Sequence, residues 1–167
     1  PTVAEALGKF RTIAQVELQG TLEGGDVLRV GRKLYAGLSR RSNAAGIRQL
    51  GDIAKAYGYD LTVVPVSGCL HLKSAVTLLG KNTLLANRAW FDWKKLQGFE
   101  WVDVHPTEKH AANALHIGTS VVFPAAFPRT AEKIGQEDFT LELLDISELQ
   151  KAESGLTCSS LLFEARG

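Results

Sequence analysis

The residues best suited to chemistry are a cysteine, a histidine and a glutamate that lie far apart in the sequence. Cys158 stands between small hydroxyl residues in Ser-Gly-Leu-Thr-Cys-Ser-Ser, residues 154–160, at the start of an apolar run. A cysteine delivered by a turn into a strand is either a packed core residue, as free cysteine commonly is, or a nucleophile. The segment alone leaves both interpretations open.

His71 lies in Leu-His-Leu-Lys-Ser, residues 70–74. On a strand, alternation would place His71 and Lys73 on one face and the two leucines on the other. A histidine on a polar strand face is free to transfer protons, although a hydrogen-bonded structural histidine is common. Glu23 precedes the pair Gly24-Gly25, which permits positive φ and a close approach of the backbone. Its carboxylate is either a solvated turn residue or part of the same site.

The remaining candidates have plain structural alternatives. Arg41 is either a surface charge ahead of a helix or a planar fork for a ligand carboxylate. Asp26 is expected to start a strand and to accept hydrogen bonds from the backbone, and Cys69 is expected in the core, facing away from His71. The other histidines lack zinc-site spacing with one another or with either cysteine: His105, His110 and His116. We therefore expect no metal.

Composition indicates a single globular domain, or a piece of one, that acts on a small molecule. The 167 residues are 45% hydrophobic and 22% charged, enough to bury a core. Nineteen basic and eighteen acidic residues give a formal charge of +1, and no lysine and arginine cluster forms the stripe of a nucleic-acid site. Neither a membrane span nor a signal peptide is indicated.

Cysteine content and the first residue bear on location and completeness. Two cysteines cannot form a disulfide framework, and no glycosylation sequon occurs, so a reducing compartment, the cytoplasm, is expected. The chain starts at Pro1 and contains no methionine. We expect that it begins after processing or part-way through a longer gene product.

Three units of hairpin, helix and strand are expected to position the candidate residues. The first has a hairpin over 27–38, a helix capped by Asn43 and ended by Gly58, and a strand over 61–66. A helix over 3–10 and a strand over 13–18 come before it. The other expected elements are strands 70–79 and 83–86, a helix near 91–96, a strand over 100–104, strands 114–117 and 121–123, a helix near 130–134, a strand over 139–144 and a helical turn at 147–150.

The unit starts, Asp26, Leu70 and Asn113, lie about 44 residues apart, which indicates an internal repeat and places the next start at Leu156. The chain then divides into a tail at 1–20, repeats at about 21–66, 67–106 and 107–152, and the start of a further repeat at 153–167. Equivalent strands of a cyclic α/β repeat point at one axis. Glu23, His71 and Cys158 are therefore expected to gather at one end of a channel, with Cys158 on a first strand.

Five motifs in order resemble the dimethylarginine dimethylaminohydrolase family, within the guanidino-group-modifying enzymes of the α/β-propeller (pentein) fold. They are Leu-Glu-Gly-Gly-Asp at 22–26, Gly-Leu-Ser-x-Arg-Ser-Asn at 37–43, Leu-His-Leu-Lys-Ser at 70–74, Ala-Ala-Asn at 111–113 and Gly-Leu-Thr-Cys-Ser-Ser at 155–160. The related arginine deiminases carry His-x-Asp where this chain has His71-Leu72-Lys73. That difference favours a methylarginine hydrolase.

The resemblance implies hydrolysis of Nω-methylated arginine to citrulline and dimethylamine or methylamine through a covalent cysteine intermediate. It assigns Cys158 as nucleophile, His71 as general acid and base, and Glu23 as the carboxylate that holds the guanidinium and supports the histidine. Arg41 matches the arginine that grips the substrate α-carboxylate, and Ala152 matches a position whose carbonyl contacts the substrate. No metal or organic cofactor is implied.

Length is where the chain departs from the family pattern. The family has five repeats, and this chain holds three whole ones with partial units at each end, so the resemblance covers a C-terminal portion. We expect a complementary N-terminal chain, and a homodimer, among its partners, and we expect the 167-residue chain alone to be inactive. The alternatives are an arginine deiminase-like hydrolase and a non-catalytic binding protein of the same fold.

Overall fold

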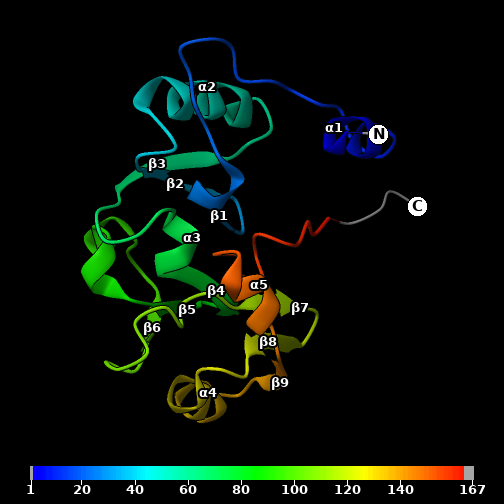
Figure 1. The fold of residues 1–167 in the computed structure, drawn as a ribbon. Coiled ribbons are helices and arrows are strands. Elements are labelled where there is room, and N and C mark those ends of the chain that lie inside the picture. Colours follow the sequence, from blue (N-terminus) through cyan, green and yellow to red (C-terminus); the bar gives the residue numbers. More distant parts are fainter. Residues whose placement is uncertain (1, 164–167) are drawn as a thin grey trace.

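The computed structural model describes residues 2–163, which form three small sheets in succession along the chain (Figure 1). Each sheet has three strands in sequence order, an antiparallel hairpin followed by a strand parallel to its second strand. The strands are β1 (Val27–Val30), β2 (Lys33–Leu38) and β3 (Asp60–Pro65); β4 (Val76–Gly80), β5 (Thr83–Ala86) and β6 (Glu100–Asp103); and β7 (Leu115–Ile117), β8 (Ser120–Pro124) and β9 (Thr140–Leu144).

A crossover segment joins the two parallel strands of each sheet, because parallel neighbours cannot be joined by a tight turn. These segments are α2 (Ala44–Lys55) in the first sheet, the 3-10 helices η2 (Arg88–Trp90) and η3 (Trp93–Lys95) in the second, and α4 (Pro128–Gly135) in the third. The Asn43 side chain caps α2 by accepting a hydrogen bond from the Gly46 amide at 2.8 Å, which confirms the predicted start of this helix.

The core lies between neighbouring sheets and consists of two clusters. In β5, Leu84 and Ala86 belong to the cluster shared with the first sheet, while Leu85 belongs to the cluster shared with the third. Alternate residues of a strand face opposite sides, so a strand buried on both faces joins two cores. The first strands of adjacent sheets approach each other, β1 with β4 and β4 with β7. The residues just before these strands are thereby brought close together.

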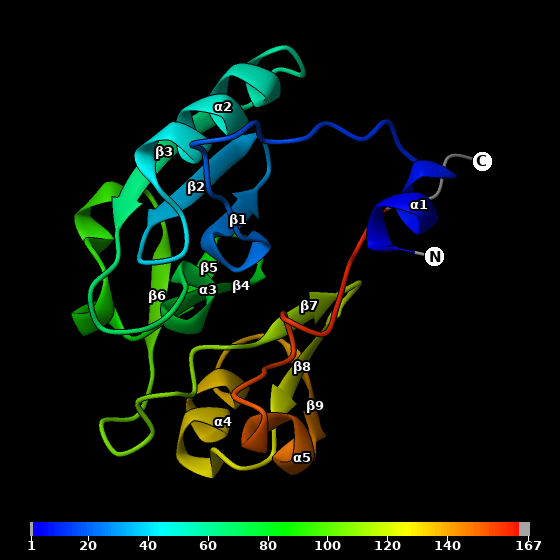
Figure 2. The same cartoon turned by 45° about the horizontal axis from the view of Figure 1, so that its top comes forward.

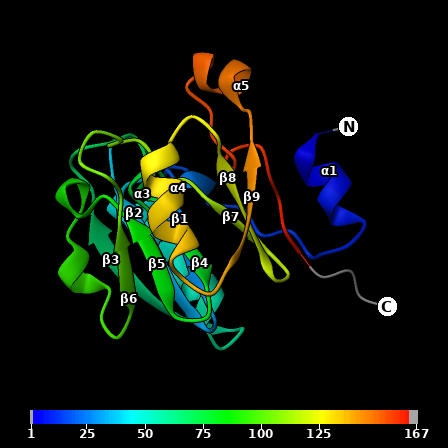
Figure 3. The ribbon, with the colours of Figure 1, turned by 90° about the horizontal axis from the view of Figure 1, so that it is seen from below.

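Four short helical elements complete the described chain: α1 (Val3–Gly8), η1 (Gly24–Asp26), α3 (Leu72–Ala75) and α5 (Ser147–Lys151). All three views show α1 standing apart from the sheets, joined to β1 by an extended segment (Figures 1, 2 and 3). The Phe10 ring meets the Phe163 ring with centroids 5.5 Å apart. The helix predicted over 3–10 is present but shorter, because α1 ends at Gly8. No helix within residues 2–163 is long and apolar enough to cross a bilayer.

Two predicted strands are wrong. Residues 12–17 form no regular structure, and Leu18 is 96% exposed, because no neighbouring strand pairs with this segment. Leu70–Leu79 is not one strand: residues 72–75 form the helical turn α3, and β4 begins only at Val76. His71 therefore precedes a helical turn instead of lying within a strand, and alternation does not place Lys73 on its face.

Three smaller expectations also need correction. The segment that holds Cys158 is a turn over 156–159 and not a strand, and the residues 164–167 of the expected fourth unit lie outside the described residues. The helix near 91–96 is replaced by η2 and η3, because Phe91 extends to form a bridge with Val66. Neither Gly24 nor Gly25 takes a positive φ, so the pair serves only the close approach described below.

Candidate active site

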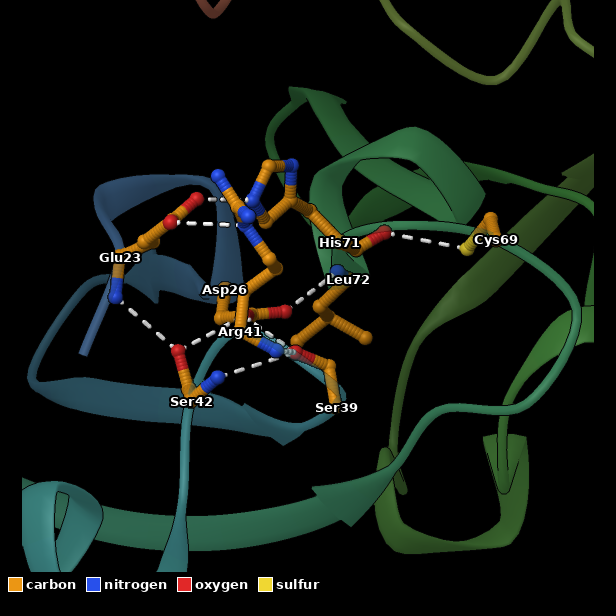
Figure 4. A network of polar contacts seen from close by, with 8 residues as sticks. All are labelled: Glu23, Asp26, Ser39, Arg41, Ser42, Cys69, His71 and Leu72. Carbon is orange, nitrogen blue, oxygen red and sulfur yellow. Dashed lines mark hydrogen bonds and ion pairs between the residues drawn. The ribbon is translucent and has the colours of Figure 1, made fainter. Parts of the chain in front are cut away.

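Glu23 and His71 form a direct hydrogen bond at the centre of the candidate site (Figure 4). Glu23 precedes η1 and β1, and His71 precedes α3 and β4, so the approach of β1 to β4 brings them together. The His71 Nε2 atom lies 2.5 Å from the Glu23 Oε2 atom. The histidine side chain is 15% exposed and the glutamate 38%, so the pair sits at the edge of the core, open on one side.

Asp26 is the buried residue that holds this pair in place. Its carboxylate is fully buried, and its Oδ1 atom accepts a hydrogen bond from the Leu72 amide at 2.9 Å. Its Oδ2 atom accepts from the Ser39 and Ser42 hydroxyls, both at 2.7 Å. The Ser42 hydroxyl in turn accepts from the Glu23 amide at 3.0 Å. Three donors offset the cost of burying a carboxylate. Asp26 thereby holds the backbone beside His71 directly and the backbone of Glu23 through Ser42.

The hydrogen bond between Asp26 and the Leu72 amide explains why residues 72–75 form a helix. The Asp26 carboxylate accepts the first free amide of α3, which a strand would have offered to a neighbouring strand. Sequence reasoning assigned Asp26 only backbone hydrogen bonds and so missed the two hydroxyl donors. The available signal was the pair of serines in the motif at 37–43.

Arg41 binds the other oxygen of Glu23. The Arg41 Nε atom lies 2.8 Å from the Glu23 Oε1 atom, and the arginine side chain is 53% exposed. The hydrogen bond from His71 lowers the pKa of Glu23 below its usual value of 4.5, burial opposes the shift, and the charge of Arg41 lowers it further. The carboxylate is therefore ionised at neutral pH and already binds one guanidinium group.

Gly25 is the residue that lets His71 lie against the backbone. A Cβ atom at this position would lie 2.7 Å from the His71 Cγ atom, closer than real contacts allow. We expect Gly25→Ala to cost about 1–3 kcal/mol of unfolding free energy and to displace the imidazole from Glu23. Urea denaturation and the NMR signals of the His71 ring nitrogens measure the two effects.

Gly24 provides the matched control for that substitution. A Cβ atom on Gly24 would meet nothing within 4 Å, so Gly24→Ala should change stability by less than about 0.5 kcal/mol. Equal effects at the two positions would contradict the assigned role of Gly25.

Cys158 lies in the exposed turn that follows α5, and two features hold this turn. The Leu156 side chain is 5% exposed, and the Thr157 amide donates to the Asn113 side chain at 3.1 Å. Burial lowers the pKa of Lys73, and the negative charges of a Cys158 thiolate and of Asp26 oppose that shift. The Asn113 side chain also donates to the Lys73 carbonyl at 3.1 Å, which joins the turn before Cys158 to α3, the element that His71 precedes.

Cys69 has a different environment, in line with its expected structural role. It packs against the core, and its Sγ atom donates to the His71 carbonyl at 3.1 Å. Burial raises the pKa of this thiol to about 11, and the charge of Asp26 adds to the shift. Very little Cys69 thiolate exists at neutral pH, so this residue supports the histidine backbone and is a poor nucleophile.

The structure brings only some of the predicted site residues into direct contact. Glu23, His71 and Arg41 are in direct contact, and the turn that carries Cys158 is joined to α3 through the Asn113 side chain. Ala152 ends α5 and is exposed, and none of the contacts described for residues 2–163 joins it to the Glu23–His71 pair. Nor do three metal-binding side chains gather anywhere in this part of the chain.

An open cleft of about 690 Å³ runs along the ends of β5 and β6, where the Arg88 guanidinium pairs with Asp103. Its lining does not include Glu23, His71 or Cys158.

Solved structures share the fold of this chain. The Pseudomonas aeruginosa enzyme named DDAH, solved with citrulline, matches 89% of this chain and 58% of its own at a TM-score of 0.83 and 35% identity. An amidinotransferase from Microseira wollei matches 90% of this chain and 49% of its own at a TM-score of 0.80, and at 17% identity it shows the fold alone. The fold and site define an α/β protein of the pentein class. Within that class, the chain is homologous to the dimethylarginine dimethylaminohydrolases.

Sequence relatives place it there. It is 36% identical over 151 residues to N(G),N(G)-dimethylarginine dimethylaminohydrolase of Pseudomonas aeruginosa, covering 90% of this chain and 59% of the relative. It is 39% identical over 142 residues to the protein of that name from Streptomyces coelicolor, covering 85% and 54%. The chain thus spans little more than half the length of these relatives. No family model matches it.

Proposed function

We propose that this chain carries the catalytic residues of a hydrolase that converts Nω-methylated arginine to citrulline and dimethylamine or methylamine. The observation that carries the proposal is the Glu23 carboxylate, which holds a guanidinium nitrogen on one oxygen and a histidine on the other. A substrate guanidinium needs the same partner, beside the same proton donor. The homology to dimethylarginine dimethylaminohydrolases reported above adds independent support.

The first half of the reaction forms a bond to sulfur. The Cys158 thiolate attacks the guanidinium carbon, which is resonance-stabilised and therefore needs a strong nucleophile. The carbon–nitrogen bond to the methylated nitrogen breaks, and His71 gives its proton to that leaving amine. A covalent S-alkylthiouronium group remains on Cys158, with its positive charge beside Glu23.

The second half consumes water. Neutral His71 takes a proton from a water molecule, which attacks the same carbon, and the carbon–sulfur bond then breaks. Citrulline leaves, the Cys158 thiolate is restored, and the second proton of the water passes to solvent. These steps use only side chains and water, and no metal or organic cofactor takes part. Because the thiol must stay free, a reducing compartment such as the cytoplasm suits the mechanism.

Two further residues bind the substrate in this proposal. Arg41 leaves Glu23 and takes the substrate α-carboxylate, a planar group that arginine binds with two hydrogen bonds. Its 53% exposure and single contact with Glu23 are consistent with such a movement. The Ala152 carbonyl contacts the substrate from the end of α5.

We also propose that the chain needs a second polypeptide for turnover. It spans 59% of the Pseudomonas aeruginosa relative, so the rest of that length has no counterpart among these residues. Hydrophobic side chains exposed near both ends of the described chain, including Leu18, Leu161 and Phe163, offer surface that a partner can cover. A complementary N-terminal chain is the expected partner, and the completed protein is expected to form a homodimer.

Turnover of asymmetric dimethylarginine and of arginine tests the function. We expect no turnover from the chain alone. We expect dimethylamine and citrulline once the chain is combined with the unmatched part of the Pseudomonas aeruginosa relative. Ammonia release from arginine as the main reaction would instead identify a deiminase. Failure of the combined protein to turn over either compound would favour the non-catalytic alternative.

A further inference from the structure

Asn113 links the cysteine turn to the histidine helix through one side chain. Its Nδ2 atom donates to the Lys73 carbonyl at 3.1 Å and to the Thr157 hydroxyl at 2.8 Å. Its Oδ1 atom accepts from the Thr157 amide at 3.1 Å. Both amide protons and one acceptor site are used, which is nearly the full capacity of an asparagine. Lys73 lies two residues after His71, and Thr157 lies immediately before Cys158.

The backbone around Asn113 is itself fixed. The buried Thr77 hydroxyl, on β4, donates to the Ala112 carbonyl at 2.8 Å and accepts from the Ala114 amide at 3.1 Å. One hydroxyl therefore forms hydrogen bonds to the backbone on both sides of Asn113, just before β7 begins. A side chain that projects from so constrained a backbone has little freedom to shift.

The cysteine turn is shaped to accept the Asn113 amide. A Cβ atom on Gly155 would lie 2.8 Å from the Asn113 Oδ1 atom and 2.9 Å from its Cγ atom, so only glycine leaves room at this position. Within residues 153–163 no strand pairing holds the turn. The Asn113 contacts and the buried Leu156 side chain are therefore its main anchors.

From this geometry we propose that Asn113 is a positioning residue, which sets the Cys158 thiol relative to His71 by bridging the two turns that carry them. The inference rests on the proposed function for its catalytic meaning. A nucleophile misplaced by 1 Å can lose about 10²-fold in rate, so a short rigid bridge between two segments distant in sequence has a large effect. The third unit thereby contributes to a site whose proposed catalytic residues, Glu23, His71 and Cys158, all lie outside it.

Hydrogen exchange tests the bridge without any need for activity. In Asn113→Ala we expect the Thr157 amide to exchange at least about tenfold faster, while core amides such as that of Leu85 keep their protection. In Thr157→Val the amide at this position should show a smaller increase in exchange rate, and in Thr157→Ser it should exchange as in the parent. Asn82→Ala is the matched control, because the Asn82 amide donates to the Gly98 carbonyl in a turn remote from Cys158.

Kinetics of the completed enzyme supply the second readout. We expect Asn113→Ala to lower kcat at least about tenfold with little change in KM, because Glu23 and Arg41 stay in place. Asn113→Asp keeps the acceptor but loses both donors, so its kcat should lie between those of the parent and of Asn113→Ala. If Asn113→Ala fails to fold, Asn113→Asp and Thr157→Val carry the same test.

The two proposals fail in different ways. Unchanged Thr157 exchange in folded Asn113 variants would overturn the positioning role, whatever the turnover. Faster Thr157 exchange in Asn113→Ala, with no turnover by the completed parent protein, would support the bridge and reject the proposed function. A fall in kcat equalled by Asn82→Ala would also overturn the positioning role.

Discussion

Replacing Cys158 with serine is expected to lower turnover of asymmetric dimethylarginine by the completed enzyme at least about 10⁴-fold. The reason is that a serine hydroxyl is hardly ionised near neutral pH and is a much weaker nucleophile than a thiolate. The other cysteine, Cys69, packs against the core and donates to the His71 carbonyl, so it does not replace Cys158. Steady-state release of dimethylamine measures the effect.

Cys69→Ser is the matched control. Its thiol has a pKa of about 11 and donates to the His71 carbonyl, a contact that a serine hydroxyl can partly replace. We expect this variant to keep turnover within a few-fold of the parent. Its Cys158 thiol should still be alkylated by iodoacetamide at pH 8. Near-normal turnover in the Cys158→Ser variant would show that the proposed covalent step is wrong.

The second large effect is expected at His71. His71→Gln should lower turnover by roughly 10²–10⁴-fold, because glutamine neither protonates the leaving amine nor later takes a proton from water. Glu23→Gln should also be strongly impaired, since it loses the charge that binds both the imidazole and the guanidinium. His105→Ala, on the loop between β6 and β7, should leave turnover unchanged.

The Glu23–His71 contact also has a pH signature. The pKa of Glu23 is lowered, so the stabilisation from this pair is complete above pH 4.5 and is lost as the pH falls through the lowered pKa. In His71→Gln the Glu23 pKa should rise toward 4.5, and in Arg41→Gln it should rise less, because the histidine contact is the largest cause. Carbon-13 NMR titration of the Glu23 carboxyl group measures this order, and the reverse order would contradict the assigned contacts.

Local sequence patterns predicted the repeated elements well. The Asn43 cap and the apolar face of α2 act within a few residues, and the hairpins of the three sheets follow from turn residues such as Gly31 and Gly118, which take positive φ. The strand predicted at 13–18 failed because it has no partner, which a local pattern does not reveal. Strand assignments depend on neighbours distant in the sequence.

The conformation at His71 was decided by residues far along the chain. The Asp26 carboxylate that turns residues 72–75 into a helix is 46 positions from the amide that it accepts, and Glu23 is 48 positions from His71. The Asn113 bridge to Thr157 spans 44 positions. Side-chain hydrogen bonds of this range have no periodic signal, so sequence reasoning found the residues without finding their contacts.

Sequence periodicity placed Glu23, His71 and Cys158 near the starts of successive units, although it assigned His71 and Cys158 to strands that the structure does not form there. Tertiary structure alone decided how they meet. Packing of β1 against β4 and of β4 against β7 brings the starts of these strands together, where Asp26 orients Glu23 and His71, and Asn113 seats the cysteine turn. The physical reason is that local periodicity specifies which face of an element is buried, whereas the register between units is set by buried polar groups that must find partners across them.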